Sequence, residues 1–154
     1  MTKTELQQVV VDYAYGYGID PQIALAQIQQ ESGFDPNAVG SSGERGLGQF
    51  MPGTWQRFGT GSFDNAFDYD YNLTAWGNYM TYLLNLFGWD YEKALIGYNG
   101  GEGHLLDPGR YGQPSQRARN YARAILANAG YASIDNHSGS PDAENSILGL
   151  SFTS

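Results

Sequence analysis

Hydrophobic residues recur at helical spacing along most of the chain. The clearest run ends at Gly88 and consists of Leu73, Trp76, Met80, Leu83, Leu84 and Phe87. These positions lie on one face of a helix over about four turns. The spacing therefore predicts a long core helix in the middle of the chain.

Residues typical of helix ends predict two helices before it. Thr4 and Gln7 have the spacing of a capping box, and the helical pattern that follows them stops at Gly18. A second helix is expected at 21–32, with Asp20 as its N-cap and a proline at its first position.

Three further helices are expected after residue 51. The first begins at residue 52 or 53, ends by Gly59 and buries Trp55 and Phe58. The other two are 91–99, capped by Asp90, and a last helix that runs from Pro114 until Gly130.

The segments between these helices are rich in Gly, Ser, Asn and Asp. Residues 34–51 predict a long ordered loop, with at most a small β-hairpin at 43–50, and loops of this length usually carry function. Residues 60–70 and 102–113 are expected to be loops as well. Residues 132–154 are polar and turn-rich, with a short apolar island at 147–150, and predict a tail or linker.

These patterns together predict a mainly α single domain over residues 1–131, with about six helices. A chain of 154 residues is long enough for one domain with its own core. It contains no cysteine, so disulfides and thiolate metal sites are excluded. The net charge of −8 argues against binding to nucleic acid or to an anionic membrane surface.

Other candidate motifs are weak. The first sixteen residues contain no apolar run long enough for a signal segment or a membrane span, so we expect no membrane insertion. Asp68, Asp70 and Asn72 have the opening spacing of a calcium loop, but Leu73 and Tyr79 replace its glycine and its closing glutamate. The two histidines, His104 and His137, are isolated, so we expect neither a metal nor a cofactor.

Glu31 is the strongest candidate for chemistry. It continues the apolar face formed by Ala24 and Ile28 and lies at the C-terminal end of its predicted helix. Both the negative end of the helix dipole and an apolar environment raise the pKa of a carboxyl group, which suits a general acid. The alternative is a solvated glutamate on the last turn of the helix.

Three sequence islands point to a known family. They are E-S-G-F-D-P at 31–36, G-L-G-Q-F-M-P at 46–52 and A-L-I-G-Y-N-G-G at 94–101. In order and spacing they resemble the soluble lytic transglycosylase (SLT) domain family, whose lysozyme-like members cleave the glycan strands of bacterial peptidoglycan. The resemblance covers about residues 19–126 and includes Asp68, Asn72 and the segment R-N-Y-A-R-A-I around Tyr121.

The resemblance implies a lysozyme-like fold and a reaction that uses one carboxyl group. Glu31 corresponds to the catalytic acid and base of the family. It would protonate the glycosidic oxygen between N-acetylmuramic acid (MurNAc) and N-acetylglucosamine (GlcNAc), then remove a proton from the muramic C6 hydroxyl. A 1,6-anhydro ring forms without water, and the 2-acetamido group of the substrate takes the place of a second carboxylate.

The resemblance also implies a set of substrate-binding residues: Ser32, Gly46, Gly48, Gln49, Phe50, Met51, Tyr98, Asn99 and Tyr121. Tyr121 is expected to donate a hydrogen bond to the Glu31 carboxylate, and Ser32 to orient that carboxylate or the acetamido group. Each has a structural alternative. The Ser32 hydroxyl would bond a free carbonyl at the helix end, the aromatic residues and Met51 would pack in the core, Asn99 would cap a helix, and the glycines would form turns.

Two positions depart from the family pattern. Gly48 stands where the family usually has methionine, and Gly100 stands where alanine commonly follows the Tyr-Asn pair. We expect these glycines to widen the subsite and to leave Glu31 unaffected.

Two other functions stay open. A hydrolase like the goose-type lysozymes would need a carboxylate to hold a water molecule, and Asp64, Asp68 and Asp70 are near enough in sequence, although family spacing makes Asp68 look structural. The second is a structural component that binds the cell wall and has the same cleft but does not cleave the glycan.

A wall substrate without a signal segment or cysteines suggests a phage origin. We expect an enzyme that binds peptidoglycan glycan strands at the bacterial wall, in the periplasm or outside the cell. It would be carried on a phage particle, with residues 132–154 as the attachment, or released at lysis. A bacterial enzyme trimmed of its leader is the alternative.

Overall fold

Eight α-helices and one short 3₁₀ helix make up residues 1–131, the part of the chain that the computed structural model describes. In chain order they are α1 (Lys3–Tyr17), α2 (Pro21–Ser32), α3 (Pro52–Phe58), η1 (Phe63–Phe67), α4 (Tyr69–Leu86), α5 (Tyr91–Gly100), α6 (Gly103–Leu106), α7 (Pro108–Tyr111) and α8 (Gln116–Asn128). The mainly α prediction is confirmed. The loop predictions for 60–70 and 102–113 are wrong, because η1, the start of α4, α6 and α7 lie there. The predicted tail at 132–154 lies outside the described residues.

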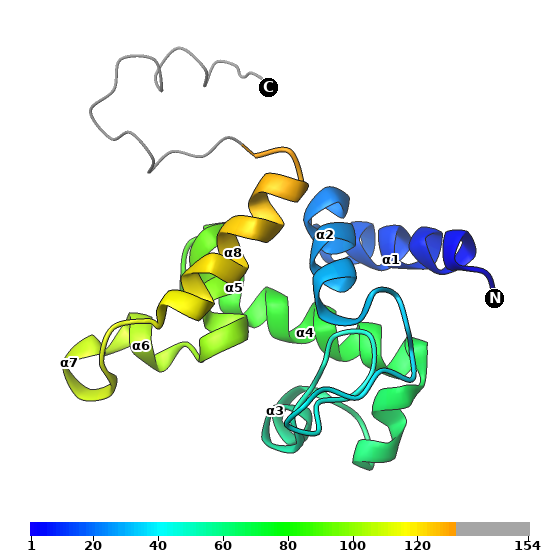
Figure 1. The fold of residues 1–154 in the computed structure, drawn as a ribbon, viewed down its shortest axis with the longest axis horizontal. Coiled ribbons are helices and arrows are strands. Elements are labelled where there is room, and N and C mark those ends of the chain that lie inside the picture. The colour runs from blue at the N-terminus through cyan, green and yellow to red at the C-terminus, as the bar shows by residue number, and fades with distance from the viewer. Residues whose placement is uncertain (132–154) are drawn as a thin grey trace.

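Helix α4 is the centre of the core, as its apolar pattern predicts. Leu73, Trp76 and Met80 are fully buried on it. The Asp68 carboxylate accepts hydrogen bonds from the first backbone amides of α4 and so fixes where the helix begins. α4 packs against α1, α3, α5 and η1 and runs through the middle of the molecule (Figure 1).

The capping box of α1 lies two residues earlier than predicted. Thr2 Oγ1 accepts from the Glu5 backbone amide at 3.0 Å, and the Glu5 carboxylate accepts from the Thr2 amide at 2.7 Å. Both Thr2–Glu5 and Thr4–Gln7 have the required spacing. The first pair is used because the charged Glu5 interacts favourably with the positive end of the helix dipole, whereas a neutral glutamine does not.

The long segment between α2 and α3, here called the cleft loop (residues 33–51), contains no strand. The predicted hairpin is reduced to single antiparallel bridges, which pair Arg45 with Val39 and with Phe50. The loop is instead held by Asn72, a fully buried residue of α4. The Asn72 amide donates to the carbonyl oxygens of Arg45 at 3.2 Å and Ala66 at 2.8 Å, and its oxygen accepts from the Gly48 amide at 2.8 Å.

The sequence G-L-G at 46–48 allows the cleft loop to approach Asn72 of α4 closely. Gly46 has a φ of 77°, and a side-chain carbon there would overlap the Ala66 carbonyl oxygen and the Asn72 amide. The glycine therefore allows the cleft loop to lie directly on α4 and η1.

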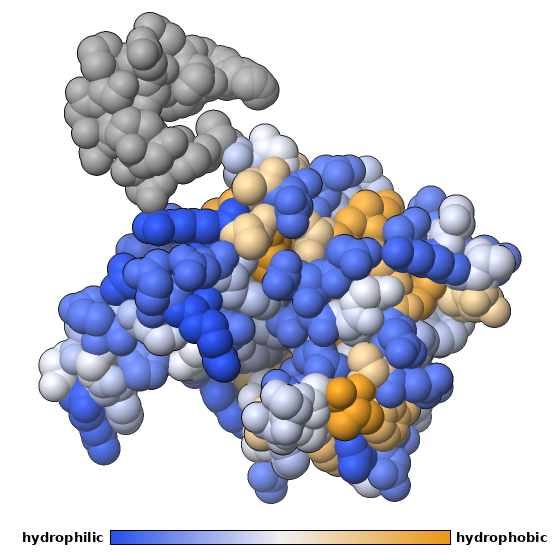
Figure 2. All heavy atoms as spheres, viewed as in Figure 1, coloured by the Kyte–Doolittle hydropathy of each residue, from blue (hydrophilic) through white to orange (hydrophobic). Residues whose placement is uncertain are grey.

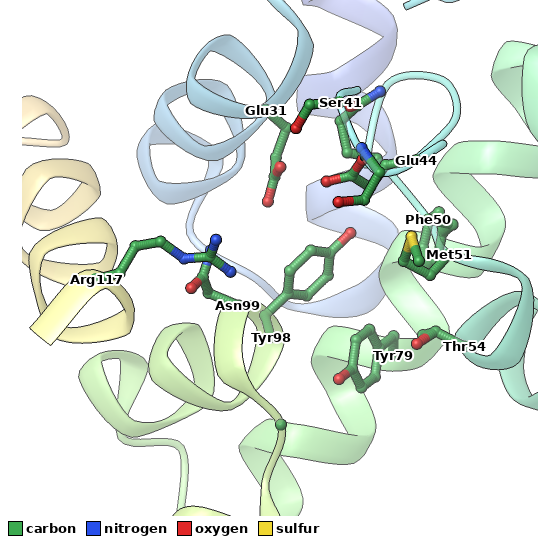
Figure 3. Close-up of a pocket in the computed structure, with 13 residues that line it drawn as sticks. Glu31, Ser41, Glu44, Phe50, Met51, Thr54, Tyr79, Tyr98, Asn99 and Arg117 are labelled. Atoms are coloured by element: carbon green, nitrogen blue, oxygen red, sulfur yellow. Dashed lines mark hydrogen bonds between the residues drawn. The ribbon is translucent and has the colours of Figure 1, made fainter. Parts of the chain in front are cut away.

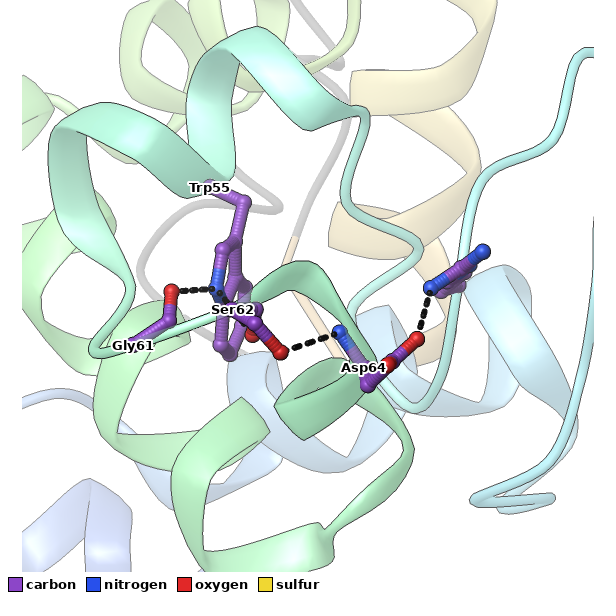
Figure 4. A network of polar contacts seen from close by, with 5 residues as sticks. Trp55, Gly61, Ser62 and Asp64 are labelled. Carbon is purple, nitrogen blue, oxygen red and sulfur yellow. Dashed lines mark hydrogen bonds and ion pairs between the residues drawn. The ribbon is translucent and has the colours of Figure 1, made fainter.

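Polar contacts also join α3 and the cleft loop to η1 (Figure 4). The Trp55 indole N–H donates to the carbonyl oxygens of Gly61 and Ser62, and the Ser62 hydroxyl caps η1 at the Asp64 amide. Asp64 forms an ion pair with Arg45 at 3.2 Å. The ion pair thus attaches the cleft loop to η1 through Arg45.

The elements are arranged around α2 and α4. In Figure 1, α5 and α8 lie on one side, the cleft loop and α3 on the other, with α2 and α4 between them. The face in this view is mostly hydrophilic, with small separate apolar areas (Figure 2). Within residues 1–131, no helix is both long enough and apolar enough to cross a membrane.

Candidate active site

Glu31 lies on the last turn of α2, on the face that the sequence predicted. Ala24 and Ile28 on the same face are fully buried, and Glu31 itself is partly buried. Burial raises the pKa of its carboxyl group to about 7, against the opposing effect of a hydrogen bond from Tyr121 and with a further increase from the negative charge of Glu44. The carboxyl group is therefore close to half protonated at neutral pH.

A chain of hydrogen bonds reaches the Glu31 carboxylate from the core. The Tyr121 hydroxyl of α8 donates to Glu31 Oε2 at 2.6 Å, as predicted. It accepts from the side-chain amide of Gln27 at 3.0 Å, and Gln27 accepts from the Trp76 indole N–H at 2.8 Å. Gln27 and Trp76 are fully buried. Because the Tyr121 oxygen accepts from Gln27, its O–H is held pointing toward Glu31.

Gln27 is a residue of the candidate site that sequence reasoning missed. It lies one helical turn before Glu31 and shares its face. A polar residue inside an apolar stripe was the signal that could have revealed it.

Tyr98 links the helices to the cleft loop. Its hydroxyl donates to the Gly48 carbonyl oxygen at 2.7 Å, and its ring packs against Phe50 and Tyr79 with centroid distances of 6.1 and 4.9 Å. Burial raises the pKa of the Tyr98 hydroxyl well above its usual value, so it stays a hydrogen-bond donor.

Two adjoining cavities form a cleft around Glu31, and Figure 3 shows the first of them. Their volumes are about 360 and 490 Å³, and both are lined by Glu31, Glu44, Asn99 and Arg117. The first is also lined by Gln49, Phe50, Met51 and Tyr98, and the second by Tyr121. The structure thus brings together Glu31 and six of the nine residues predicted to bind substrate.

The other three predicted residues do not line either cavity. The Ser32 hydroxyl donates to the Ile28 carbonyl oxygen at 3.2 Å, which is the structural alternative stated from the sequence. Gly46 and Gly48 are buried residues of the cleft loop itself and shape its backbone.

The expected widening at the two unusual glycines is wrong. A side-chain carbon at Gly48 would lie 2.7 Å from the Tyr98 hydroxyl, and one at Gly100 would lie 3.1 Å from Cβ of Ala118. Neighbouring side chains therefore occupy the space that a methionine or an alanine would begin to fill.

Gln49 both supports the cleft loop and lines the cleft. It has a φ of 53°, which is unusual for a residue with a side chain. Its amide nitrogen donates to the carbonyl oxygens of Gly46 at 2.9 Å and Ala38 at 3.2 Å.

Glu44 and Arg117 also line the cleft, and sequence reasoning missed both. Glu44 Oε1 accepts from the Ser42 backbone amide at 2.9 Å, and the carboxylates of Glu44 and Glu31 point into the same space in Figure 3. A charged residue between two glycines in a loop expected to carry function was a signal for Glu44. Arg117 had no such signal, since it is one of several arginines on α8.

The three aspartates considered as water-holding groups lie outside the cleft. Asp64 pairs with Arg45, Asp68 caps α4 as its spacing suggested, and Asp70 accepts a hydrogen bond from the Tyr13 hydroxyl at 3.0 Å. Within the described part of the chain, Glu44 is the second carboxylate that lines both cavities with Glu31.

The sequence model of the "Transglycosylase SLT domain" family matches residues 8–121. The chain belongs to this family. Membrane-bound lytic murein transglycosylase F of Desulfosudis oleivorans is 37% identical over 98 residues, which are 59% of this chain and 21% of the relative. Peptidoglycan transglycosylase gp16 of Escherichia phage T7 is 31% identical over 107 residues, 62% of this chain and 8% of the relative.

A solved structure has the same fold as this SLT domain. The 70-kDa soluble lytic transglycosylase from Escherichia coli superimposes with a TM-score of 0.68 and 26% identity, over 82% of this chain and 23% of that protein. The lysozyme-like fold expected from the resemblance is thereby confirmed. The chain spans only a small part of the length of each relative.

Proposed function

We propose that the chain is a peptidoglycan lytic transglycosylase that cleaves the β-1,4 bond between MurNAc and GlcNAc without water. The observation that carries the proposal is Glu31. Its carboxyl group lies in a cleft, has a pKa raised to about 7 and accepts a fixed hydrogen bond from Tyr121. Similarity to proteins named lytic murein transglycosylase and peptidoglycan transglycosylase supports an activity of this class.

In the first step, the protonated Glu31 gives its proton to the glycosidic oxygen. The bond between that oxygen and C1 of MurNAc breaks, and the GlcNAc end leaves as an alcohol. The positive charge at C1 is stabilised by the 2-acetamido group of the substrate. The raised pKa serves this step because the acid must hold its proton near neutral pH.

In the second step, the Glu31 carboxylate removes the proton from the C6 hydroxyl of the same MurNAc. O6 then bonds to C1, and the 1,6-anhydro ring closes with Glu31 protonated again. Between the two steps Glu31 is an anion, and the hydrogen bond from Tyr121 stabilises that form. One carboxyl group is therefore sufficient, and no net proton is consumed.

Product mass tests the proposal. Purified peptidoglycan is digested with the protein, and the released muropeptides are analysed by mass spectrometry. Anhydro products, each one water lighter than the reducing form, are expected from the wild type and not from Glu31→Gln. A control variant, Glu92→Gln, changes a carboxylate outside both cavities and should give wild-type products.

A hydrolytic muramidase is the second candidate, and Glu44 favours it. A carboxylate across the cleft from the acid is the arrangement in which a water molecule attacks C1. This candidate gives reducing ends in place of anhydro ends in the same experiment. A structural wall-binding component would release no muropeptides.

We further propose that the enzyme acts on the bacterial wall as part of a phage particle or a phage lysis system. The similarity to the transglycosylase of phage T7 supports this origin. Activity of purified particles in a gel containing peptidoglycan would support a virion enzyme. Activity found only in the lysate would support release at lysis.

A further inference from the structure

The cleft contains one cation beside two carboxylates. Arg117, on the first turn of α8, lines both cavities together with Glu31 and Glu44 (Figure 3). It makes no ion pair, hydrogen bond or ring contact with any residue from 1 to 131. An arginine that lines a cleft without a protein partner is free to bind an anionic group of a ligand.

The other arginines of the described chain are all engaged. Arg45, Arg57 and Arg123 form ion pairs with Asp64, Glu102 and Glu92, Arg119 donates to the Pro114 carbonyl oxygen, and Arg110 lies over the Tyr111 ring. Arg117 therefore differs from them in both position and partners.

Asn99 provides a second, independent observation. It lines the same two cavities, and its side-chain oxygen is buried without a hydrogen-bond partner. A buried acceptor without a donor is unfavourable. A ligand N–H that enters the cleft would give this oxygen the donor that residues 1–131 do not supply.

We propose that Arg117 and Asn99 form a subsite for the peptide stem attached to MurNAc. The guanidinium binds a stem carboxylate, and the Asn99 oxygen accepts an N–H from a stem amide. The inference rests on the proposed function for the identity of the ligand. It extends that function from the sugar strand to the peptide.

The chemistry of the substrate favours the stem. The sugar rings are uncharged, whereas the stem carries amide groups followed closely by free carboxylates. The planar guanidinium binds a carboxylate through two parallel hydrogen bonds. The second cavity adjoins the first at Glu31, so a stem on the MurNAc being cleaved would lie beside Arg117.

Two other groups offer part of this chemistry. The acetamido groups of the sugars have an N–H, and the lactyl group of MurNAc becomes a carboxylate when the stem is removed. Three matched glycan oligomers distinguish the stem from the acetamido and lactyl groups as the ligand of Arg117 and Asn99. The first carries stems with free carboxylates, the second carries the same stems with the carboxylates converted to amides, and the third lacks stems.

Binding is measured by calorimetry in the Glu31→Gln background, so that no cleavage occurs. We expect the carboxylate stems to bind about two- to fivefold more tightly than the amidated stems, since an exposed ion pair contributes modestly. Arg117→Ala in the same background should abolish this preference. Asn99→Ala should weaken binding of both stem-bearing oligomers and keep the preference.

Arg110→Ala, outside both cavities, is the matched control and should keep all affinities. Equal binding of the carboxylate and amide stems would overturn the subsite. Equally tight, Arg117-dependent binding of the stripped oligomer would overturn it as well, because the lactyl carboxylate would then be the ligand. The products formed by the wild type test the reaction separately. If the protein preferred carboxylate stems but released no anhydro products, the proposed function would be refuted and the proposed subsite would still be supported.

Discussion

The two walls of the cleft are built in different ways. The helical wall consists of α5 and α8, which pack against each other and place Tyr98, Asn99 and Tyr121. The loop wall consists of the cleft loop, which places Glu44 and Gln49 without any regular secondary structure. The helical wall is positioned by apolar packing between helices, whereas the loop wall combines two buried apolar residues, Leu47 and Phe50, with polar contacts to Asn72.

This difference determines how each wall responds to substitution. Packing energy in the helical wall is spread over many buried atoms, so removing one polar group there changes chemistry more than geometry. The loop wall depends on Asn72 and on Gly46, and these have no substitute nearby. Single substitutions should therefore mainly affect activity in the helical wall and mainly affect stability at the supports of the loop wall.

Asn72→Ala should have the largest effect on stability. It removes three hydrogen bonds and leaves the buried Gly48 amide and the Ala66 carbonyl oxygen without their Asn72 partner, whereas the Arg45 carbonyl oxygen keeps the Phe50 amide as a donor. We expect a loss of about 4 kcal/mol in the free energy of unfolding, measured by urea denaturation. Asn78→Ala, at an exposed site on the same helix, should cost less than about 1 kcal/mol. A comparable loss in both variants would contradict a special role for Asn72.

Glu31→Gln should stabilise the protein at alkaline pH. The folded-state pKa of Glu31 is about 7, above its ordinary value of 4.5, so the folded state holds this proton more tightly than the unfolded state. The resulting stability is fully present below pH 4.5 and is lost as pH rises through 7. Because the glutamine stays neutral, the variant should exceed the wild type by about 3 kcal/mol at pH 9 and match it at pH 4.

Thermal melting at the two pH values measures this difference. Glu92→Gln serves as the control, since Glu92 lies outside the cleft, and it should show no such gain. If Glu31→Gln gave the same shift in melting temperature at both pH values, the raised pKa would be refuted.

The sequence predicted the helical wall better than the loop wall. The helices were visible because apolar residues recur at helical spacing and because Asp20, Asp90 and the glycines mark their ends. The short α6 and α7 were missed because four residues are too few to show a period. The α1 cap was misplaced because two Thr-x-x-Glu/Gln pairs overlap, and their spacing alone does not distinguish the charged Glu5 from the neutral Gln7.

The candidate site was predictable where a residue acts from a helix. Glu31 and Tyr121 could be placed from helix position and family motif, and their hydrogen bond is present. Glu44 and the support from Asn72 could not be placed, because they depend on contacts between segments distant in the sequence. The widening expected at Gly48 was wrong for the same reason, since Tyr98 reaches it from 50 residues away.

Tyr121→Phe tests the helical wall and should mainly affect activity. The ring keeps its packing, and the hydrogen bond that stabilises the Glu31 anion is lost. A hydrogen bond to a charged group contributes about 1.5–3 kcal/mol, so kcat should fall by about 10- to 100-fold. The bond also lowers the pKa of Glu31, so the alkaline limb of the pH–rate profile should move to higher pH.

The control for this variant is Tyr111→Phe, at an exposed tyrosine outside both cavities, which should behave as the wild type. A fall in kcat without any movement of the alkaline limb would indicate that Tyr121 positions the substrate and does not tune Glu31.

Glu44→Gln tests the loop wall, and its expected effect is the smallest. The substitution keeps the size of the side chain and removes a negative charge that raises the pKa of Glu31, so the alkaline limb should move to lower pH. Tyr121 of the helical wall thus lowers the pKa of Glu31, and Glu44 of the loop wall raises it. The change in kcat at pH 6 should be about two- to fivefold, because the charge is partly exposed and screened. A loss of several hundredfold, together with a change in the ratio of anhydro to reducing ends, would instead mean that Glu44 holds an attacking water, and the loop wall would then carry chemistry of its own.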